Sequence, residues 1–322
     1  MKTLQPLVTF SREVVVLTVL LTTRNRSRIF ASALECFCML RAPSSGWKLV
    51  IVDNGSTDST NMVVRSYESR LPLEYLLEPK LGKNAALNMG LGAVEGDLIV
   101  FTDDDVFPNP NWLIQLRSAA DTNPEYSIFG GPILPKWEVP PPNWIQWVEQ
   151  RPAYALTDPS LREGRVSPRL VYGGNMAIRA NLFTAETRFN TSIGPCGADY
   201  AQGGETELII RLSRLGHKAW HVTSARVAHL IRQEQMKKSW VMRRAVRFGR
   251  GEFRLGYSEA LLGAPGELVR GFLKEGLKIL KGTLLLQPER AFRCSWRFHY
   301  LKGQIMEARS LARNSAPPQS LR

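Results

Sequence analysis

The chain has 322 residues, of which 44% are hydrophobic, and a net charge of +13. This length and composition fit a globular protein with one large domain, or one domain and an appendage. Its longest apolar runs, such as residues 14–17, are far shorter than the ~20 residues that cross a bilayer, so we expect no membrane-spanning helix. Residues 1–11 lack the charged start and long apolar stretch of a secretory signal, so we expect a cytoplasmic protein.

The first predicted elements alternate between strand and helix. An unbroken apolar run, Val14–Leu21, predicts a parallel strand, and it leads into a polar turn at residues 22–27. Apolar residues at helical spacing from Ile29 to Leu40 predict an amphipathic helix. Residues 48–52 predict the second strand, which ends in the turn-forming segment 53–58.

A third strand opens at Asp97 and ends in Asp103, Asp104 and Asp105. Side chains alternate along an extended backbone, so Asp103 and Asp105 are expected to point one way and Asp104 the other. Three adjacent charges at the end of a buried strand repel one another and suit a bound cation. Magnesium and manganese prefer oxygen ligands, and magnesium is typically held by one or two carboxylates plus substrate phosphates. A solvated acidic turn is the alternative.

The order of these elements indicates how they assemble. Strands alternating with helices and short loops are typical of a mostly parallel sheet covered by helices, and they predict an α/β fold. Right-handed crossovers bring the ends of parallel strands to one edge of the sheet, where such folds bind ligands. The polar segments 22–26, 53–58 and 103–105 should therefore meet in one crevice.

The second half of the chain is less regular. Residues 112–120 predict a helix, and residues 135–168 form a long irregular stretch with little periodicity. Its aromatic rings fit two interpretations equally, binding to sugar faces or packing on the sheet. These rings are Trp137, Trp144, Trp147 and Tyr154.

A helix beginning at residue 204 and ending before Gly216 follows a short predicted strand, 172–178. Glu205 lies in the first turn of that helix, where the helix dipole stabilises a carboxylate. Residues 219–229 predict one or two closing strands.

The C-terminal region is strongly basic. Residues 231–322 contain 19 Lys and Arg against 7 Glu and no Asp, so they carry nearly all of the net charge. Residues 268–286 alternate leucines with lysines, which is typical either of a helix on an anionic membrane surface or of a helix docked on the catalytic domain. We expect peripheral membrane association. No zinc finger or RNA-binding signature supports a nucleic acid partner.

The four cysteines show no metal-binding or disulfide spacing. We expect ordinary buried thiols in a reducing compartment.

Six segments in order, and a later histidine, resemble family 2 glycosyltransferases with the GT-A fold over roughly residues 14–230. The segments are Leu21–Arg26, Ile51–Asp58, Gly82–Asn88, Phe101–Asp105, Gly173–Met176 and Gly204–Leu208, and the histidine is His229. The resemblance implies inverting transfer of a sugar from a nucleotide diphosphate donor, with UDP or GDP as the expected nucleotide, to a hydroxyl of a glycan or lipid-linked acceptor. It implies a nucleotide-sugar half at about 1–107 and an acceptor half at about 108–230, and the uneven charge sets a basic helical region at 231–322 apart from both.

The same resemblance implies roles for single residues. The nucleotide sugar would be bound by Thr22, Thr23, Arg24, Asp53, Lys83, Asp103 and Asp104. Asp105 would hold Mn²⁺ or Mg²⁺, and His229 would complete the metal shell, with a structural role as its alternative. We expect Asp53, Lys83, Asp105 and Glu205 to line a common cavity.

The expected catalytic base is Glu205, and here the chain departs from the family. Family members usually have Glu-Asp before Thr-Glu-Leu, whereas this chain has Gly204-Glu205, a side chain one methylene longer. Glu207 is a fallback base or a simple helix cap. The expected acceptor-binding residues are Trp137, Gly174, Asn175 and Glu207. Two other functions remain: a scaffold subunit with an impaired site, and a nucleotidyltransferase.

Overall fold

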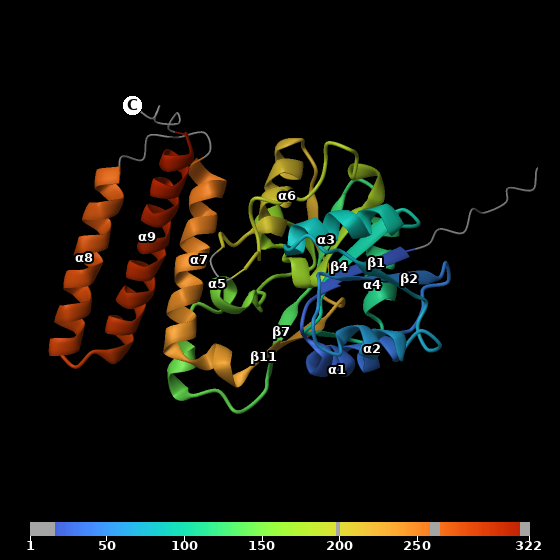
Figure 1. Ribbon diagram of the computed structural model, residues 1–322, viewed down its shortest axis with the longest axis horizontal. Coiled ribbons are helices and arrows are strands. Elements are labelled where there is room, and N and C mark those ends of the chain that lie inside the picture. The colour runs from blue at the N-terminus through green and yellow to red at the C-terminus, as the bar shows by residue number, and fades with distance from the viewer. Residues whose placement is uncertain (1–16, 198–199, 258–264, 316–322) are drawn as a thin grey trace, which may run out of the picture.

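The computed structural model describes residues 17–197, 200–257 and 265–315 (Figure 1). Two expectations fall partly or wholly outside these ranges: the one drawn from residues 1–11 about a secretory signal, and the first three residues of the predicted strand Val14–Leu21. The described chain forms a mixed α/β sheet region and, beside it, a layer of three long helices.

An eight-stranded sheet organises the first 231 residues, in the order β3-β2-β1-β4-β9-β6-β10-β8. Its strands are β1 Leu17–Thr23, β2 Trp47–Asp53, β3 Leu73–Leu77, β4 Leu98–Asp103, β6 Ile128–Gly130, β8 Gly164–Val166, β9 Met176–Arg179 and β10 Ala219–His221. Strands β3, β2, β1 and β4 are parallel, whereas β9 is antiparallel to both of its neighbours. The predicted α/β class with a mostly parallel sheet is confirmed.

Helices cover both faces of this sheet (Figure 1). The helices α1 Ser27–Cys38, α2 Thr60–Arg65 and α4 Trp112–Thr122 bury their apolar sides on one face, together with alternate residues of β1 such as Val19 and Leu21. The helices α3 Lys83–Gly90 and α6 Gly204–Arg214 cover the other face, with Leu20 of β1. Alternation along a buried strand supplies both cores, which is why β1 reads as an unbroken apolar run.

A second, three-stranded sheet has the order β5-β11-β7, with β5 Val106–Pro108, β11 Val227–Ile231 and β7 Ile133–Trp137. Strand β5 begins directly after Asp105 and pairs antiparallel with β11, in a register that sets Val106 opposite His229. This pairing carries a histidine from far along the chain to the three aspartates.

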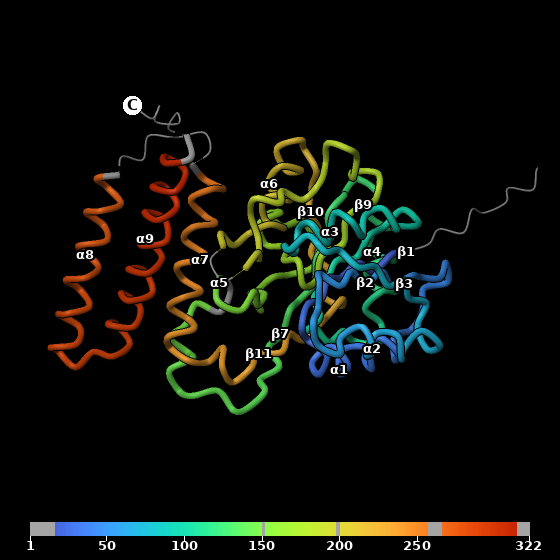
Figure 2. The backbone as a smooth tube through the Cα atoms, viewed as in Figure 1, coloured from blue at the N-terminus to red at the C-terminus, as the bar shows by residue number. Residues whose placement is uncertain are grey.

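The helical layer consists of α7 Lys238–Tyr257, α8 Pro265–Leu284 and α9 Pro288–Ser315, with α9 lying between the other two (Figure 2). It shares a hydrophobic core with the sheet region, because Val241 and Ala245 of α7 and Phe292 and Trp296 of α9 belong to the same buried cluster as β1. A domain boundary near residue 230 therefore remains a prediction. None of the described helices is long and apolar enough to pass through a bilayer.

The irregular stretch 135–168 contains one short helix, α5 Gln150–Tyr154, and the strand β8. Its aromatic rings pack rather than lie open: Trp144 and Trp147 contact Phe292 of α9, and Tyr154 stacks on Trp240 of α7 at 5.8 Å between ring centroids. Of the two interpretations, packing is therefore the one observed. The remaining short elements are 3₁₀ helices: η1 Leu91–Ala93, η2 Asn143–Trp147, η3 Pro168–Leu170, η4 Gly173–Asn175, η5 Ala180–Leu182 and η6 Gln233–Met236.

Candidate active site

The three aspartates form a tight turn between β4 and β5, and each has its own partner. Asp103 Oδ1 accepts a hydrogen bond from Lys83 Nζ at 2.6 Å. Asp104 Oδ2 accepts one from Thr23 Oγ1 at 2.8 Å. The predicted alternation of side chains fails, because the extended backbone ends at Asp103 and the next two residues turn. All three carboxylates consequently line the same cavity.

Asp105 contacts two basic side chains, Arg26 and His229. Its Oδ2 accepts from Arg26 Nη1 at 3.3 Å, and its Oδ1 lies 3.5 Å from His229 Nε2. The other ring nitrogen of His229, Nδ1, lies 2.9 Å from the carbonyl oxygen of Tyr154. A carbonyl can only accept, so Nδ1 carries a proton and Nε2 faces the carboxylate. A histidine oriented in this way is typical of metal ligands.

Burial and mutual repulsion disturb the titration of this turn. Burial and the negative charge of Asp105 raise the pKa of Asp104. Burial also opposes the charged form of Asp105, but the hydrogen bond and charge of His229, with Arg26 nearby, hold its pKa well below the usual range. The pKa of His229 is raised, because its contact with Asp105 outweighs burial. The pKa values of Asp104 and Asp105, adjacent in one turn, are thus shifted in opposite directions.

Lys83 connects the turn to the expected catalytic base. Its Nζ donates to Asp103 and, at 2.5 Å, to Glu205 Oε1. Gly173 makes this approach possible, because a Cβ at that position would lie 2.8 Å from Glu205 Cγ and Oε1. Burial opposes charge on both partners, yet their attraction raises the pKa of Lys83 and lowers the pKa of Glu205. Glu205 is therefore ionised at neutral pH.

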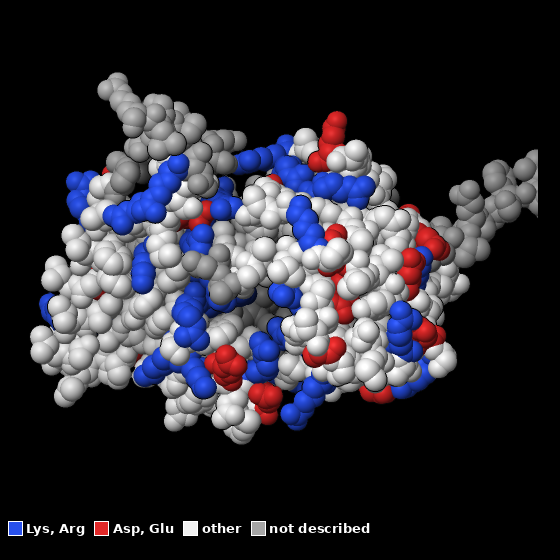
Figure 3. Space-filling model, in the orientation of Figure 1, with Lys and Arg blue, Asp and Glu red and all other residues white. Residues whose placement is uncertain are grey.

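These groups surround a cavity of about 440 Å³ between the strand tips and α7. Figure 3 shows a hollow in this part of the surface with Lys and Arg side chains around it. The predicted residues that line the cavity are Thr22, Thr23, Arg24, Lys83, Asp103, Asp104, Asp105 and His229. The predicted crevice at one edge of the sheet thus exists and contains most of the expected nucleotide-sugar residues.

Two residues expected in a common cavity are not among those that line it. Asp53 lines a separate cavity of about 480 Å³, where its carboxylate accepts hydrogen bonds from Tyr75 Oη at 2.9 Å and from the amide of Ser56 at 2.7 Å. Its neighbour Asn54 lines the main cavity instead. Glu205 is drawn to the Lys83 ammonium, and its side chain is 19% exposed. The expectation of one cavity for all four residues is therefore wrong for Asp53 and Glu205.

The expected acceptor-binding residues occupy structural positions. Asn175 is fully buried, and its amide donates to the carbonyls of Pro132 and Ala225 while its oxygen accepts from Trp112 Nε1. Both amide hydrogens and the amide oxygen of Asn175 thus have partners within the protein, and its role in binding the acceptor stays a prediction.

Glu207 and Trp137 likewise do not line the cavity. Glu207 forms a two-point ion pair with Arg211 one turn along α6, at 3.0 Å for each contact. Trp137 packs edge-on against Tyr154 at 5.9 Å between ring centroids. Gly174 lies closer to the chemistry: a Cβ there would be 3.5 Å from Asp103 Oδ2.

Four arginines in the cavity wall were not predicted as site residues: Arg26, Arg232, Arg244 and Arg247. Arg244 and Arg247 come from α7, and Arg244 is buried enough that its pKa is lowered. Its Nε has no hydrogen-bond acceptor in the described part of the chain. The mixture of basic and aromatic residues at 237–250 was the feature of the sequence that could have indicated Arg244 and Arg247. Their place in the cavity wall follows only from the folding of α7 over the strand tips.

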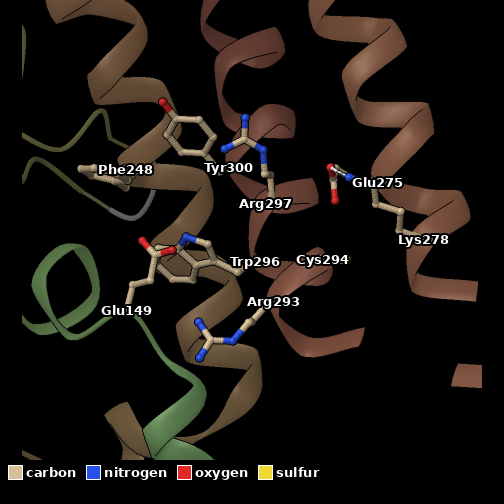
Figure 4. A pocket seen from close by; sticks show the side chains of 9 residues that line it. All are labelled: Glu149, Phe248, Glu275, Lys278, Arg293, Cys294, Trp296, Arg297 and Tyr300. Carbon is tan, nitrogen blue, oxygen red and sulfur yellow. Dashed lines mark hydrogen bonds and ion pairs between the residues drawn. The ribbon is translucent and has the colours of Figure 1, made fainter. Parts of the chain in front are cut away.

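The cysteines differ from expectation, since none of the four is fully buried and Cys196 is exposed and lines the cavity. Another cavity, of about 410 Å³, lies within the helical layer between α7, α8 and α9 (Figure 4). One of its two acids, Glu275, is paired with Lys278 at 2.7 Å. It contains no counterpart of the aspartate turn.

The side chains of the main cavity fit a divalent cation shared with a ligand. Within the described ranges, no cluster of three or more His, Cys, Asp or Glu could hold a metal by itself. The pair Asp105 and His229 supplies two ligands, and ligands about 2.1 Å from one cation lie at most about 4.2 Å apart, which includes the observed 3.5 Å. Phosphate oxygens would complete the shell, and the unpaired Arg244 Nε suits the same anion.

Residues 18–183, just over half of the chain, match the family model described as Glycosyl transferase family 2. The chain belongs to this family. Among curated relatives, it is 30% identical to the chondroitin synthase of Escherichia coli over 99 residues, which is 30% of this chain and 14% of the relative. It is 33% identical over 105 residues to the validoxylamine A glucosyltransferase of Streptomyces hygroscopicus subsp. jinggangensis, covering 32% and 25%. The family 2 chain thus spans a quarter or less of the length of these relatives.

Solved structures share the fold of this family 2 glycosyltransferase over nearly its whole length. The mannosyltransferase PcManGT of Pyrobaculum calidifontis, in complex with GDP-Man and Mn²⁺, superposes with a TM-score of 0.60 at 19% identity, covering 91% of this chain and 86% of that one. Residues 1–349 of S. aureus TarS, in complex with UDP-GlcNAc, give 0.54 at 14% identity and 92% coverage of each. The predicted GT-A fold is confirmed.

Proposed function

We propose that this family 2 chain is a metal-dependent inverting glycosyltransferase. It would transfer a sugar from a nucleotide diphosphate donor to a hydroxyl of a glycan or lipid-linked acceptor. The observation that supports this most directly is the pairing of Asp105 with His229 in a cavity lined by Lys83 and five arginines. Paired metal ligands and surplus cations in one cavity suit a diphosphate better than a neutral ligand.

In this proposal the strand tips bind the donor. Thr22, Thr23 and Arg24 follow β1 and would contact the nucleotide, while Asp103 would reach the ribose. Arg244 and Arg247 would pair with diphosphate oxygens from the α7 side. Asp53 would bind the base or ribose only if the ligand reaches from the main cavity, which its neighbour Asn54 lines, into the cavity of Asp53 itself.

Asp105 and His229 would hold Mn²⁺ or Mg²⁺, which neutralises the charge that develops on the departing nucleoside diphosphate. The structural neighbour in complex with GDP-Man and Mn²⁺ supports this assignment. Nucleotidyl transfer is less compatible with membership of this family.

Glu205 is the proposed general base for the acceptor hydroxyl. Its ion pair with Lys83 keeps it ionised and therefore able to accept a proton. Such a base contributes typically about 10²–10⁴-fold to the rate. To act, the carboxylate must exchange its contact with Lys83 for the acceptor, and donor phosphates competing for Lys83 would allow this exchange.

The test is donor turnover by the variant Asp105→Asn, measured as release of nucleoside diphosphate from UDP- and GDP-sugars with Mn²⁺ and after chelation. We expect at least a hundredfold loss, together with loss of thermal stabilisation by donor and Mn²⁺. The control is Asp121→Asn, which removes a carboxylate paired with Arg117 on the surface of α4. Unchanged turnover in Asp105→Asn would refute the metal role, and no turnover in the unaltered protein with any donor would favour the scaffold alternative.

A further inference from the structure

Helix α8 is the outermost element of the helical layer and packs on α9 through one side only (Figure 1). On that side Phe272 stacks on Phe298 of α9 with 3.9 Å between ring centroids. Leu268 is buried on the same side. This inner side already supplies the apolar contacts that a helix needs for docking on its neighbour.

The opposite side of α8 is also apolar. Its side chains recur at spacings of four, four, three and four residues, which places them on one face. They are Val269, Leu273, Leu277, Leu280 and Leu284, with exposed fractions of 36%, 59%, 69%, 62% and 82%. The surface continues into the following turn through Leu285 and Leu286, exposed by 53% and 88%. We call these seven residues the α8 stripe, and no described residue covers them.

Exposed basic side chains on α8 are arranged along one edge of the stripe. Arg270, Lys274 and Lys281 are exposed and each follows a stripe residue by one position, so they lie along the same flank. Of the two acids on α8, Glu275 is only 6% exposed and is paired with Lys278. Glu267, in the first turn, is exposed, which leaves three exposed basic side chains against one acid. In Figure 3 the surface at the left edge, over α8, shows broad uncharged areas with basic side chains beside them.

We propose that the α8 stripe docks on an anionic lipid bilayer. A contiguous apolar surface of this kind marks an interaction site. Leucines on one face with cations beside them are the composition of helices that lie in the membrane interface, where the cations pair with lipid phosphates. A second copy of the chain fits less well, because antiparallel pairing of two α8 helices about a two-fold axis sets the cationic flanks against each other.

This surface lies outside the candidate active site, and the inference does not rest on the proposed catalysis. Within the basic C-terminal region, the proposal assigns the membrane contact to one face of α8. Helices α9 and α7 then lie between this contact and the cavity wall.

The experiment is co-sedimentation of the full chain with vesicles of phosphatidylcholine alone and with 30% phosphatidylglycerol. The variant Leu277→Ser/Leu280→Ser changes side chains exposed by 69% and 62%, so the fold should tolerate it. Its matched control, Met62→Ser/Leu215→Ser, changes side chains exposed by 70% and 69% on the sheet region. We expect at least a tenfold loss of binding to anionic vesicles in the first variant and none in the control.

A third variant, Arg270→Gln/Lys274→Gln/Lys281→Gln, should abolish the preference for anionic over neutral vesicles. Absence of vesicle binding by the unaltered chain would overturn the proposal. So would equal losses in the two serine variants. A dimer seen by light scattering, lost in Leu277→Ser/Leu280→Ser without any vesicle binding, would assign the stripe to a second copy instead. None of these variants should change donor turnover in solution, so the membrane proposal and the proposed function can fail independently of each other.

Discussion

Two lysines in this protein show how position decides what an ion pair does. Lys83 bridges Asp103 and Glu205 in the cavity, at 2.6 and 2.5 Å. Lys48 bridges Glu74 and Glu95 at 2.8 and 2.5 Å, but those carboxylates are 40% and 60% exposed. Distances alone would rank the two clusters as equal, whereas solvent weakens the second.

We therefore expect Lys83→Met to lower the free energy of unfolding by roughly 1.5–3 kcal/mol, because it leaves two enclosed carboxylates without their charged donor. The variant Lys48→Met should cost less than about 1 kcal/mol. Chemical denaturation of both variants is the measurement. Equal losses would show that the cavity is as well solvated as the surface.

A second residue-scale prediction concerns acid stability. Hydrogen bonds from Arg70 and then from Tyr67 lower the pKa of Glu35 to about 2, from an ordinary value of 4.5. A lowered pKa in the folded state means that the contact stabilises the protein above about pH 4.5 and is lost as the pH falls toward 2. Glu35→Gln should flatten this part of the stability profile, measured by urea denaturation between pH 2.5 and 6. Glu68→Gln, in a nearby surface pair with Arg65, should leave the slope as it is.

At the scale of elements, the crossing of α7 and α9 depends on glycines. A Cβ at Gly249 of α7 would lie 2.0 Å from the carbonyl oxygen of Tyr300, and a Cβ at Gly303 of α9 would lie 2.1 Å from that of Val246. Both contacts are with backbone, which cannot rotate away. The close crossing also brings Glu307 of α9 to Arg250 of α7 at 2.7 Å.

Gly249→Ala should accordingly destabilise the protein by about 1–3 kcal/mol, the usual cost of overpacking, because the two helices must separate. Gly256→Ala is the control in the same helix, since a Cβ there meets nothing within 4 Å. That change should stabilise by about 0.5–1 kcal/mol through helix propensity. Thermal unfolding of the two variants compares them, and destabilisation of both would refute the role of the crossing.

At the scale of the whole molecule, the helical layer serves the sheet region in two ways. It completes the hydrophobic core with residues such as Val241 and Phe292, and it supplies Arg244 and Arg247 to the cavity. A chain ending at residue 230 should therefore lose cooperative unfolding and donor binding together. Calorimetry and donor titration would check this, and a stable truncated protein with unchanged donor affinity would establish an independent domain.

The sequence alone predicted the sheet class, the three aspartates at the end of a strand and the crevice at the strand ends. Apolar runs and helical periodicity are local patterns, so they can be recognised in the sequence. Because parallel strands end at the same edge of a sheet, the polar residues that follow them lie close together there. It did not indicate β3, Leu73–Leu77, whose residues are half-buried and carry no clear alternation. It also placed three aspartates on an extended backbone that in fact turns after the first.

Only the tertiary structure decided which partners each charge finds. The register of β5 on β11 brings His229 to Asp105, the absence of a Cβ at Gly173 brings Glu205 to Lys83, and α7 closes the cavity with arginines. Asn175 looked like a ligand-binding residue in its motif, but its amide holds three separate segments together. Residue type and spacing along the chain thus determined which groups are available to this protein. Long-range packing determined which of them face the cavity, because such contacts join residues whose separation in sequence has no periodic signature.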